Sequence, residues 1–390
     1  MRIGEQEIGP GHPPYVIAEI GVNHDGEVER ALMLTDAAAD AGADAVKLQL
    51  FETDRLMSKA AKLAAYQKNA GETDPLAMLR RLELSIDDMA KVVHRAHARG
   101  IHAIVTVFSV ELVEVAERLE WDAYKSASPD IINRPLLEAM ANTGKPLIVS
   151  TGASELGEVT RAAGWLEGIR DRLAFLQCVS SYPAPDEALG GIRAIADATG
   201  LVTGYSDHTA SHRTGSLATM AGAHLLEKHI TDDRKRAGPD HAASLLLAQL
   251  EQYVQLARNG ATVQEDFAKF IDRFVIAMRG ADFKPHHLAE FYPQEYDLYY
   301  KRFGADGLVR AHFCDPKKVI LDCERDVREV SRQSLVSTRA LREGDVLTRE
   351  MLTIKRPGSG VPPFLMEEMI GRRVVRDVEM DVPIVREDVE

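Results

Sequence analysis

Two histidines, each two residues beyond another polar side chain at the end of an apolar run, are the side chains best suited to chemistry. Ser206 and His208 end one run, and Glu227 and His229 end another. Residues i and i+2 of an extended strand share a face, so each pair is expected to point to one side. Two neighbouring strand ends would then present two imidazoles to one site. A divalent cation held by few protein ligands, which serves as an electrophile in sugar or carboxylate chemistry, would suit such a site.

The elements that position these histidines follow a regular order, because short β-branched runs alternate with amphipathic stretches as far as about residue 257. Helices are predicted over residues 27–41 and 85–99, with Ser85 as a cap and Gly100 as a stop for the second. Eight strand-then-helix units predict an α/β fold, a (β/α)8 TIM barrel, more readily than an open sheet. The predicted strands cover residues 15–19, 45–49, 103–107, 122–125, 147–150, 174–178, 202–206 and 225–229.

Polar side chains end nearly every predicted strand, which is where barrel enzymes carry their chemistry. They include Glu19, Lys47, Gln49, Thr106, Lys125, Ser128, Ser150, Tyr182, Ser206, His208, Glu227 and His229. Each one taken singly fits a strand-end cap or a solvated loop residue equally well, but eight such ends together favour a site. Lys47 and Lys125 with several hydroxyl groups indicate a phosphate or carboxylate site, because ammonium and hydroxyl groups donate hydrogen bonds to anions.

Composition places the chain among ordinary globular proteins. Its 390 residues exceed what one hydrophobic core usually fills, so we expect a large domain and a smaller one. No apolar run approaches the roughly 20 residues of a membrane span, so no membrane partner is expected. The net charge of −13 argues against a nucleic-acid partner. The first residues lack a signal-peptide pattern and the three cysteines lack disulfide spacing, so we expect a cytoplasmic location.

Motifs at the strand ends resemble those of the sialic acid synthase family. Each motif is short, but their order and their spacing by barrel units make the signal specific. In chain order they are IAEIGVNH at 17–24, AGADAVKLQ at 41–49, STG at 150–152, YP at 182–183, GYSDHT at 204–209, EKH at 227–229, GPDH at 238–241 and KRPGSG at 355–360. The resemblance implies a nonulosonic (sialic-type) acid synthase, a transferase that condenses phosphoenolpyruvate with an N-acylated hexose such as N-acetylmannosamine. Water would be consumed and phosphate released by C–O cleavage.

The resemblance also implies roles for individual residues. His208 and His229 correspond to ligands of manganese or magnesium, and Glu19 and Asp240 correspond to catalytic carboxylates near the sugar and metal. Glu227 would orient an imidazole from behind. The residues implied in substrate binding are Lys47, Gln49, Thr106, Lys125, Ser128, Ser150, Tyr182, Ser206 and Arg356. Histidines outside the motifs are expected to be structural, and His24 and His241 are expected to be at most neighbours of the site.

The same resemblance divides the chain into three predicted regions. Residues 1–258 form the catalytic barrel, and 331–390 resemble the β-rich antifreeze-like (SAF) domain of the family. In that family the SAF domain covers the active site of the other subunit, which implies a domain-swapped homodimer with Arg356 reaching the sugar. Residues 259–330 form a connecting segment that is longer than usual in the family, and its apolar content favours folded structure.

Two other classes of function fit parts of the pattern. One is a different metal-dependent barrel aldolase or synthase that acts on another phosphorylated donor or makes another surface-polysaccharide sugar acid. The other is a non-catalytic carbohydrate-binding protein, which the presence of Glu19, His208 and His229 disfavours. The identity of the acceptor sugar stays open, because the matched positions mostly hold the donor and the metal.

Overall fold

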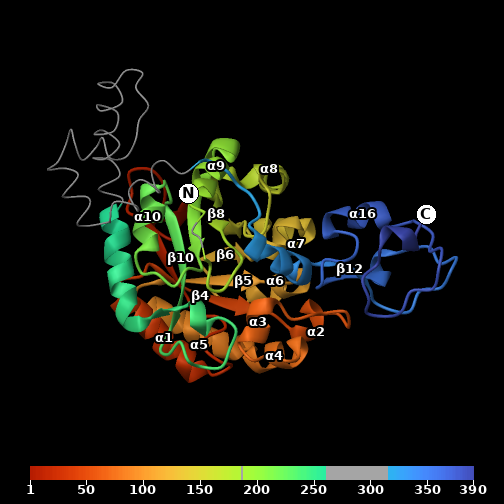
Figure 1. Ribbon diagram of the computed structural model, residues 1–390, viewed down its shortest axis with the longest axis horizontal. Coiled ribbons are helices and arrows are strands. Elements are labelled where there is room, and N and C mark those ends of the chain that lie inside the picture. The colour runs from red at the N-terminus through yellow and green to blue at the C-terminus, as the bar shows by residue number, and fades with distance from the viewer. Residues whose placement is uncertain (186–187, 261–314) are drawn as a thin grey trace, which may run out of the picture.

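Eight parallel strands close into a barrel with helices around the outside (Figure 1). The computed structural model describes residues 1–185, 188–260 and 315–390. Strand β10 pairs with both β9 and β3, which closes the sheet and confirms the predicted TIM barrel. The predicted strands agree with the observed ones to within two residues at every end. The barrel strands are β3 (Tyr15–Glu19), β4 (Ala45–Leu50), β5 (His102–Val107), β6 (Ala123–Ser126), β7 (Leu147–Ser150), β8 (Leu173–Cys178), β9 (Val202–Asp207) and β10 (Leu225–Thr231).

Alternation along each strand divides the side chains between the barrel interior and the surrounding helices. In β4, Val46 and Leu48 belong to the apolar layer between strands and helices, whereas Ala45 belongs to a separate cluster inside the barrel with Ile17 and Ile104. Lys47 follows Ala45 by two residues and therefore shares the inner face. The interior is thus apolar toward the start of the strands and polar toward their carboxyl ends.

The helices pack outside the strands and begin and end where the sequence signals predict. Ser85 Oγ accepts the N–H of Asp88 at 3.1 Å and caps α5, and Gly100 follows the helix with a φ of +74°. The helices around the barrel are α1 (Val28–Asp40), α5 (Ile86–Ala98), α6 (Val110–Ala116), α7 (Arg134–Ala141), α8 (Leu156–Trp165), α9 (Gly190–Thr199) and α10 (Thr214–Met220). Residues 247–260 are also helical, and the short strands β1 (Arg2–Ile3), β2 (Gln6–Glu7) and β11 (Leu245–Leu246) complete this part.

The connection between β4 and α5, residues 51–85, is long enough to carry three short helices beside the barrel mouth. They are α2 (Thr53–Leu56), α3 (Ala65–Asn69) and α4 (Pro75–Leu82). Helix α4 starts at Pro75 with Asp74 as its cap, whose Oδ1 accepts the N–H of Leu76 at 2.8 Å. The apolar faces of α2 and α4 pack with Phe51 and Phe108 in a cluster of their own.

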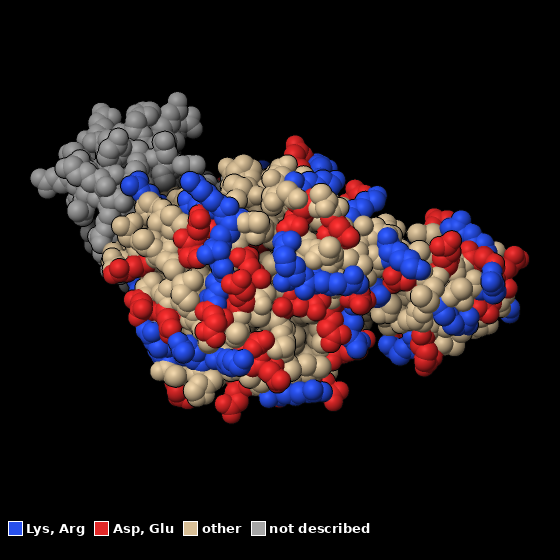
Figure 2. Space-filling model, turned by 90° about the horizontal axis from the view of Figure 1, so that it is seen from below, with Lys and Arg blue, Asp and Glu red and all other residues tan. Residues whose placement is uncertain are grey.

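A small β-rich domain follows the barrel and protrudes beside α6 and α7 (Figure 1). Its strands β12 (Ser334–Ser337) and β13 (Leu352–Lys355) pair antiparallel, and α16 (Met366–Met369) covers a separate apolar core that includes Leu335 and Ile384. Acidic and basic side chains are interspersed over both lobes in the view from below (Figure 2).

Residues just before this domain and at its start fasten it to the barrel. Arg328 and Arg332, in and after α15 (Arg325–Ser331), donate to the carboxylate of Glu158 at 2.6–3.1 Å. Burial opposes ionisation of Glu158, but the two guanidinium groups outweigh it and lower the pKa of Glu158 to about 2. Gln333 bridges Asn133 and the carbonyl of Phe108.

The predicted division at residues 258 and 330 stays a prediction. Residues 261–314, most of the predicted connecting segment, lie outside the described residues. No helix in the described ranges combines the length and hydrophobicity needed to cross a bilayer.

Candidate active site

A pocket opens at the carboxyl ends of the barrel strands and contains about 900 Å³ of space, part of it open to solvent. The structure brings most of the predicted site residues to its walls. They are Lys47, Gln49, Thr106, Lys125, Ser128, Tyr182, Ser206, His208, His229, Asp240 and Arg356. Glu19 and Ser150 are fully buried and do not line the pocket, and Ser150 Oγ has no hydrogen-bond partner among the described residues.

Three buried ion pairs lie at the floor of the pocket, where Lys47, Lys125 and Glu227 line the space and Glu19 lies beneath Lys47 without lining it. Lys47 Nζ contacts the carboxylate of Glu19 and donates to Thr106 Oγ1 at 2.9 Å. Glu227 lies 3.3 Å from Lys125 Nζ and 3.7 Å from Lys47 Nζ. The strand register explains the contact between Lys47 and Glu19, because the two residues are partners on β4 and β3. Thr106 is the β5 partner of Gln49, two residues from Lys47 on the same strand.

The two carboxylates of the floor have opposite pKa shifts. Burial raises the pKa of Glu19 to about 7, although Lys47 opposes the shift. Burial also disfavours the ionised form of Glu227, but Lys125 and Lys47 outweigh it and hold the pKa of Glu227 well below its usual range. Glu227 is therefore the permanent counter-ion of the lysines, whereas Glu19 can gain or lose a proton near neutral pH.

The prediction that the carboxylate of Glu227 orients an imidazole is wrong, because this carboxylate is bound by other side chains. Its carboxylate accepts a hydrogen bond from Ser206 at 2.8 Å and pairs with the two lysines. His208 is oriented instead by the backbone, because its Nδ1–H donates to the carbonyl of Val179 at 2.8 Å. Glu227 and His229 are two residues apart and therefore share one face of the strand. The groups that the Glu227 carboxylate contacts, however, come from neighbouring strands of the closed barrel.

The two predicted metal ligands lie together at the pocket wall. The ring centroids of His208 and His229 are 5.5 Å apart, and Tyr182 stacks on His208 with a centroid distance of 4.1 Å. Burial lowers the pKa of both imidazoles, so both are neutral at pH 7 and carry a free lone pair. Asp240 lies beside them, with Oδ2 3.6 Å from His229 Nδ1.

This donor set fits a divalent cation. The bond from His208 Nδ1 to Val179 leaves the Nε2 lone pair available, and the buried Nδ1 of His229 has no hydrogen-bond partner among the described residues. Within the described ranges no group of three or more His, Cys, Asp or Glu side chains could hold a metal ion. The two imidazoles would hold such a cation and would leave its other positions to substrate and solvent.

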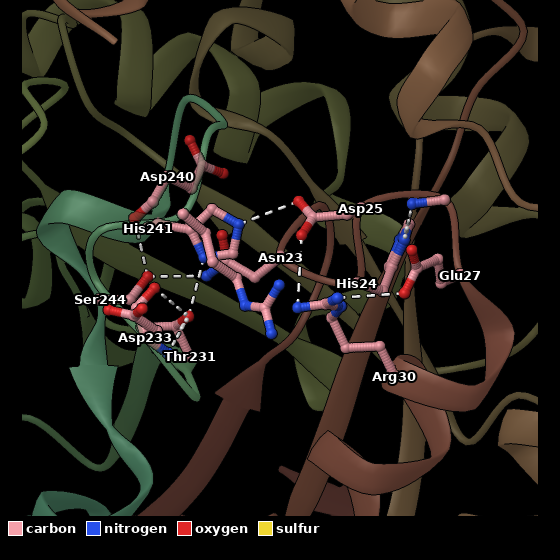
Figure 3. Close-up of polar contacts among 12 residues, drawn as sticks. Asn23, His24, Asp25, Glu27, Arg30, Thr231, Asp233, Asp240, His241 and Ser244 are labelled. Carbon is pink, nitrogen blue, oxygen red and sulfur yellow. Dashed lines mark hydrogen bonds and ion pairs between the residues drawn. The ribbon is translucent and has the colours of Figure 1, made fainter.

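The loop that carries Asp240 is anchored by contacts that do not face the pocket (Figure 3). His241 bridges two residues, because its Nδ1 lies 2.8 Å from Thr231 Oγ1 and its Nε2 lies 2.9 Å from Asp25 Oδ1. Ser244 Oγ donates to the carbonyl of Asp240 at 2.7 Å. His241 is therefore structural and places its neighbour Asp240 beside the histidines. Burial raises the pKa of Asp240 to about 6.

Arg356 reaches the pocket of its own chain. Its backbone N–H donates to the carbonyl of Leu56 at 2.8 Å, its carbonyl accepts from Ser58 N at 3.0 Å, and its guanidinium lies 5.5 Å from the centre of the Phe108 ring. Burial lowers the pKa of Arg356, and the nearby Asp130 opposes this. The structure is that of one chain, so the domain-swapped homodimer stays a prediction.

Several site residues were not found from the sequence. Tyr66 stacks on Tyr182 with centroids 4.7 Å apart, and Asp130 is fully buried with both carboxylate oxygens unpartnered among the described residues. Glu324, from the segment where the family resemblance fails, accepts the N–H groups of Ala153 and Ser180 at 2.7 Å each. Ala153 lies three residues beyond β7 and Ser180 two residues beyond β8, and Ser180 lines the pocket, so Glu324 holds the loops at the pocket rim.

Comparison with known proteins places the chain in a family. A family model described as the NeuB family matches residues 34–269, and a SAF domain model matches residues 332–390. The chain belongs to the NeuB family. Among the relatives of this NeuB-family chain, N,N'-diacetyllegionaminic acid synthase of Legionella pneumophila is 31% identical over 385 residues, covering 96% of this chain and 94% of that one. N-acetylneuraminate-9-phosphate synthase of Homo sapiens is 28% identical over 394 residues, covering 98% and 94%.

A solved structure supports the same architecture along the whole chain. The spore coat polysaccharide biosynthesis protein SpsE of Bacillus subtilis matches with a TM-score of 0.77 and 26% identity, covering 100% of this chain and 99% of that one. The predicted combination of barrel and SAF domain is therefore confirmed.

Proposed function

We propose that this NeuB-family protein is a nonulosonic acid synthase, a transferase that condenses phosphoenolpyruvate with an N-acylated hexose. The observation that carries the proposal is the meeting of two buried lysines, several hydroxyl groups and two neutral imidazoles in one barrel mouth. The similar proteins that have curated activities are named as synthases of acids of this class.

The donor would occupy the floor of the pocket. Phosphoenolpyruvate is a trianion at its most ionised, and Lys47 and Lys125 would supply positive charge to it. Thr106, Ser128 and Ser206 line the pocket and would supply directed hydrogen bonds, whereas the predicted Ser150 does not line it. Glu19 and Glu227 neutralise the lysines in the structure, so donor binding requires the ion pairs to rearrange.

The acceptor aldehyde would lie at the histidine wall. His208 and His229 would hold manganese or magnesium, and a cation bound there would polarise the aldehyde carbonyl. Gln49, Tyr182 and Asp240 line the same region and would orient the open-chain sugar. Arg356 would reach it from the SAF domain.

Glu19 would manage the proton of the condensation. Its pKa of about 7 already includes the opposing effect of Lys47. A donor anion beside Lys47 adds negative charge nearby and raises the pKa of Glu19 further. Glu19 would therefore carry a proton when both substrates are bound, and it could deliver that proton to the aldehyde oxygen as the bond forms.

The atoms of the reaction balance with water as the only reactant besides the two substrates. The enol carbon of phosphoenolpyruvate bonds to the aldehyde carbon, and the aldehyde oxygen takes a proton. Water adds at the carbon that bears phosphate and releases one proton. The C–O bond to phosphate then breaks, phosphate leaves with the bonding pair, and the new hydroxyl gives up its proton to leave a keto acid.

Phosphate release from phosphoenolpyruvate tests this function. We expect release only when both an N-acylated hexose and manganese or magnesium are present, with a product mass equal to that of the nine-carbon keto acid. Release without sugar would indicate a phosphatase. The absence of release with every sugar would favour a different metal-dependent aldolase or a non-catalytic sugar-binding protein.

We also propose that the protein acts as a homodimer in which SAF domains are exchanged, on the strength of the family resemblance. In a domain-swapped dimer, the contacts that the SAF domain makes with the barrel of its own chain are made with the barrel of the other chain instead. Mixing the inactive Arg356→Ala and His208→Asn variants under conditions that allow subunit exchange should then restore activity, because one of the two sites would have both residues. Absence of recovery in a mixed dimer would support the intrachain arrangement instead.

A further inference from the structure

A buried ion pair outside the pocket links the two strands that carry the histidines. Asp207 of β9 and Lys228 of β10 are partners in the strand pairing, and Lys228 Nζ lies 3.1 Å from Asp207 Oδ1. Both side chains are completely buried, and neither lines the pocket. Asp207 immediately precedes His208, and Lys228 immediately precedes His229. Because successive residues of a strand point to opposite faces, the ion pair lies on the outer face of the barrel, next along the chain to both histidines.

The surroundings of this ion pair are apolar. Lys228 alternates with Leu226 and Ile230, which belong to the apolar layer between strands and helices, and its Nζ lies 5.9 Å from the centre of the Tyr253 ring. Two charges in such a layer lose their hydration, and an apolar pair of similar volume is often equally stable or more stable. The stability of the fold alone therefore gives no reason for an ion pair at these positions.

The ammonium group of Lys228 contacts the chain on both sides of His208. It pairs with the carboxylate of Asp207 and donates a hydrogen bond to the carbonyl of Thr209. Asp207 Oδ1 in turn accepts the N–H of Thr209 at 2.9 Å and its hydroxyl at 2.8 Å. One buried cation, adjacent in the chain to His229, thus fixes the strand end that carries the other histidine.

The two imidazoles have few other restraints. His208 Nδ1 donates to the carbonyl of Val179 at 2.8 Å, whereas His229 Nδ1 has no hydrogen-bond partner among the described residues. The place of the His229 ring relative to His208 therefore depends on how the backbones of β9 and β10 are held together. The contacts of Lys228 hold them at the point where the histidines begin to face the pocket.

We propose that Asp207 and Lys228 are positioning residues, which hold His208 and His229 at the separation that a divalent cation requires. The inference rests on the metal assignment of the proposed function and deepens it, because it names residues that act on the ligands through the backbone. Loss of the ion pair lets the two strand ends shift relative to each other while the barrel stays closed. The 5.5 Å between the two ring centroids is then no longer fixed.

The double variant Asp207→Asn/Lys228→Met tests this role. It removes both charges and the hydrogen bond to the Thr209 carbonyl, but an amide oxygen at position 207 can still accept the N–H of Thr209. Methionine is close to lysine in length and suits the apolar layer, so the unfolding temperature should stay close to that of the native protein. The Kd for manganese, measured by electron paramagnetic resonance on the folded proteins, should rise by about 10- to 100-fold, as when groups that orient metal ligands are removed.

Two further variants control for a general loss of order in the barrel. Tyr15 is also completely buried, and its hydroxyl lies 2.9 Å from His102 Nδ1 at the opposite end of the strands. Tyr15→Phe removes this polar contact between strands and should bind manganese as the native protein does. Asp207→Asn alone keeps Lys228 and its bond to Thr209, so it should weaken manganese binding less than the double variant does.

The outcomes separate this inference from the function on which it rests. A native protein that does not bind manganese would count against the metal assignment itself. A native Kd in the folded double variant would keep both histidines as ligands and overturn the positioning role, as would an equal loss of affinity in Tyr15→Phe. If the double variant does not fold, Asp207→Asn decides, because a raised Kd supports the role and a native Kd overturns it.

Discussion

Glu324 provides the sharpest test of how the segment after the barrel supports the site. The proposed change is Glu324→Ala, which removes a carboxylate that is 1% exposed and accepts three backbone N–H groups, two from barrel loops at 2.7 Å and that of Leu321 at 2.9 Å. The two barrel groups belong to Ala153 and Ser180 and would be left buried without an acceptor. Each buried N–H group without an acceptor costs about 1–3 kcal/mol. The free energy of unfolding should therefore fall by roughly 2–6 kcal/mol, and by the lower end of this range if water enters.

The kinetic consequence should fall on the donor. Ala153 follows Gly152, whose N–H donates to Ser128 Oγ at 2.9 Å, and Ser128 and Ser180 line the pocket. Loosening these two loops should raise the KM for phosphoenolpyruvate about tenfold, equivalent to about 1.4 kcal/mol. The KM for the acceptor should change less than twofold, because the histidine wall and Arg356 do not contact Glu324 among the described contacts.

Thermal unfolding and steady-state kinetics measure the two effects on the same preparations. Glu324→Gln should be intermediate, because an amide oxygen can still accept both N–H groups. Glu329→Ala is the matched control, since Glu329 is exposed in the same segment and its loss should change stability by less than about 0.5 kcal/mol. A Glu324→Ala variant with native stability and native KM for phosphoenolpyruvate would refute the reasoning, as would an equal rise in both KM values.

Three further predictions concern titratable groups of the site. Burial raises the pKa of Asp130 from 3.8 to about 7, so the native state binds its proton more tightly than the unfolded chain, and this contribution to stability is lost as pH rises from about 4 to 7. Asp130→Asn should therefore be more stable than the native protein by up to roughly 4 kcal/mol at pH 8 and should show no such gain below pH 4. Denaturant unfolding at both pH values measures this gain. An equal difference in stability at both pH values would contradict the prediction. His208→Asn and His229→Asn should each abolish manganese binding measured by electron paramagnetic resonance, whereas the exposed His94→Asn should bind as the native protein does; binding retained in both site variants would remove the ligand assignment. Glu19→Gln should largely abolish turnover while the protein stays folded. The native protein should lose an infrared band of protonated carboxyl groups as pH rises through about 7, and this band should be weaker in the variant. An active Gln variant would remove the proton-transfer role.

The strands and their inner faces could be predicted because both depend on local periodicity. Lys47 and Gln49 share the inner face of β4, as alternation requires, and His208 follows the last residue of β9 and lines the pocket with Ser206. Closure of eight such units then brings His208 and His229 to one wall. The observed 5.5 Å between their rings agrees with that expectation.

Contacts that depend on the register between strands could not be predicted in the same way. Glu227 shares a face with His229, but closure places its carboxylate against Ser206, Lys125 and Lys47. Leu56, Met78 and Leu82 of the β4–α5 connection line the pocket, although these apolar residues carry no polar pattern that would mark them as part of a site. Glu324 is separated from its partners Ala153 and Ser180 by more than 140 residues and lies where no family motif matches.

The path of the bridging oxygen of phosphoenolpyruvate tests the central claim most directly. The native protein would be given phosphoenolpyruvate labelled with ¹⁸O between carbon and phosphorus, together with manganese and the N-acylated hexose that supports phosphate release. Mass analysis of both products locates the label. C–O cleavage at this barrel mouth predicts that the label leaves entirely with inorganic phosphate and that none is released without sugar. Label in the organic product, or phosphate release without the sugar, would contradict the account.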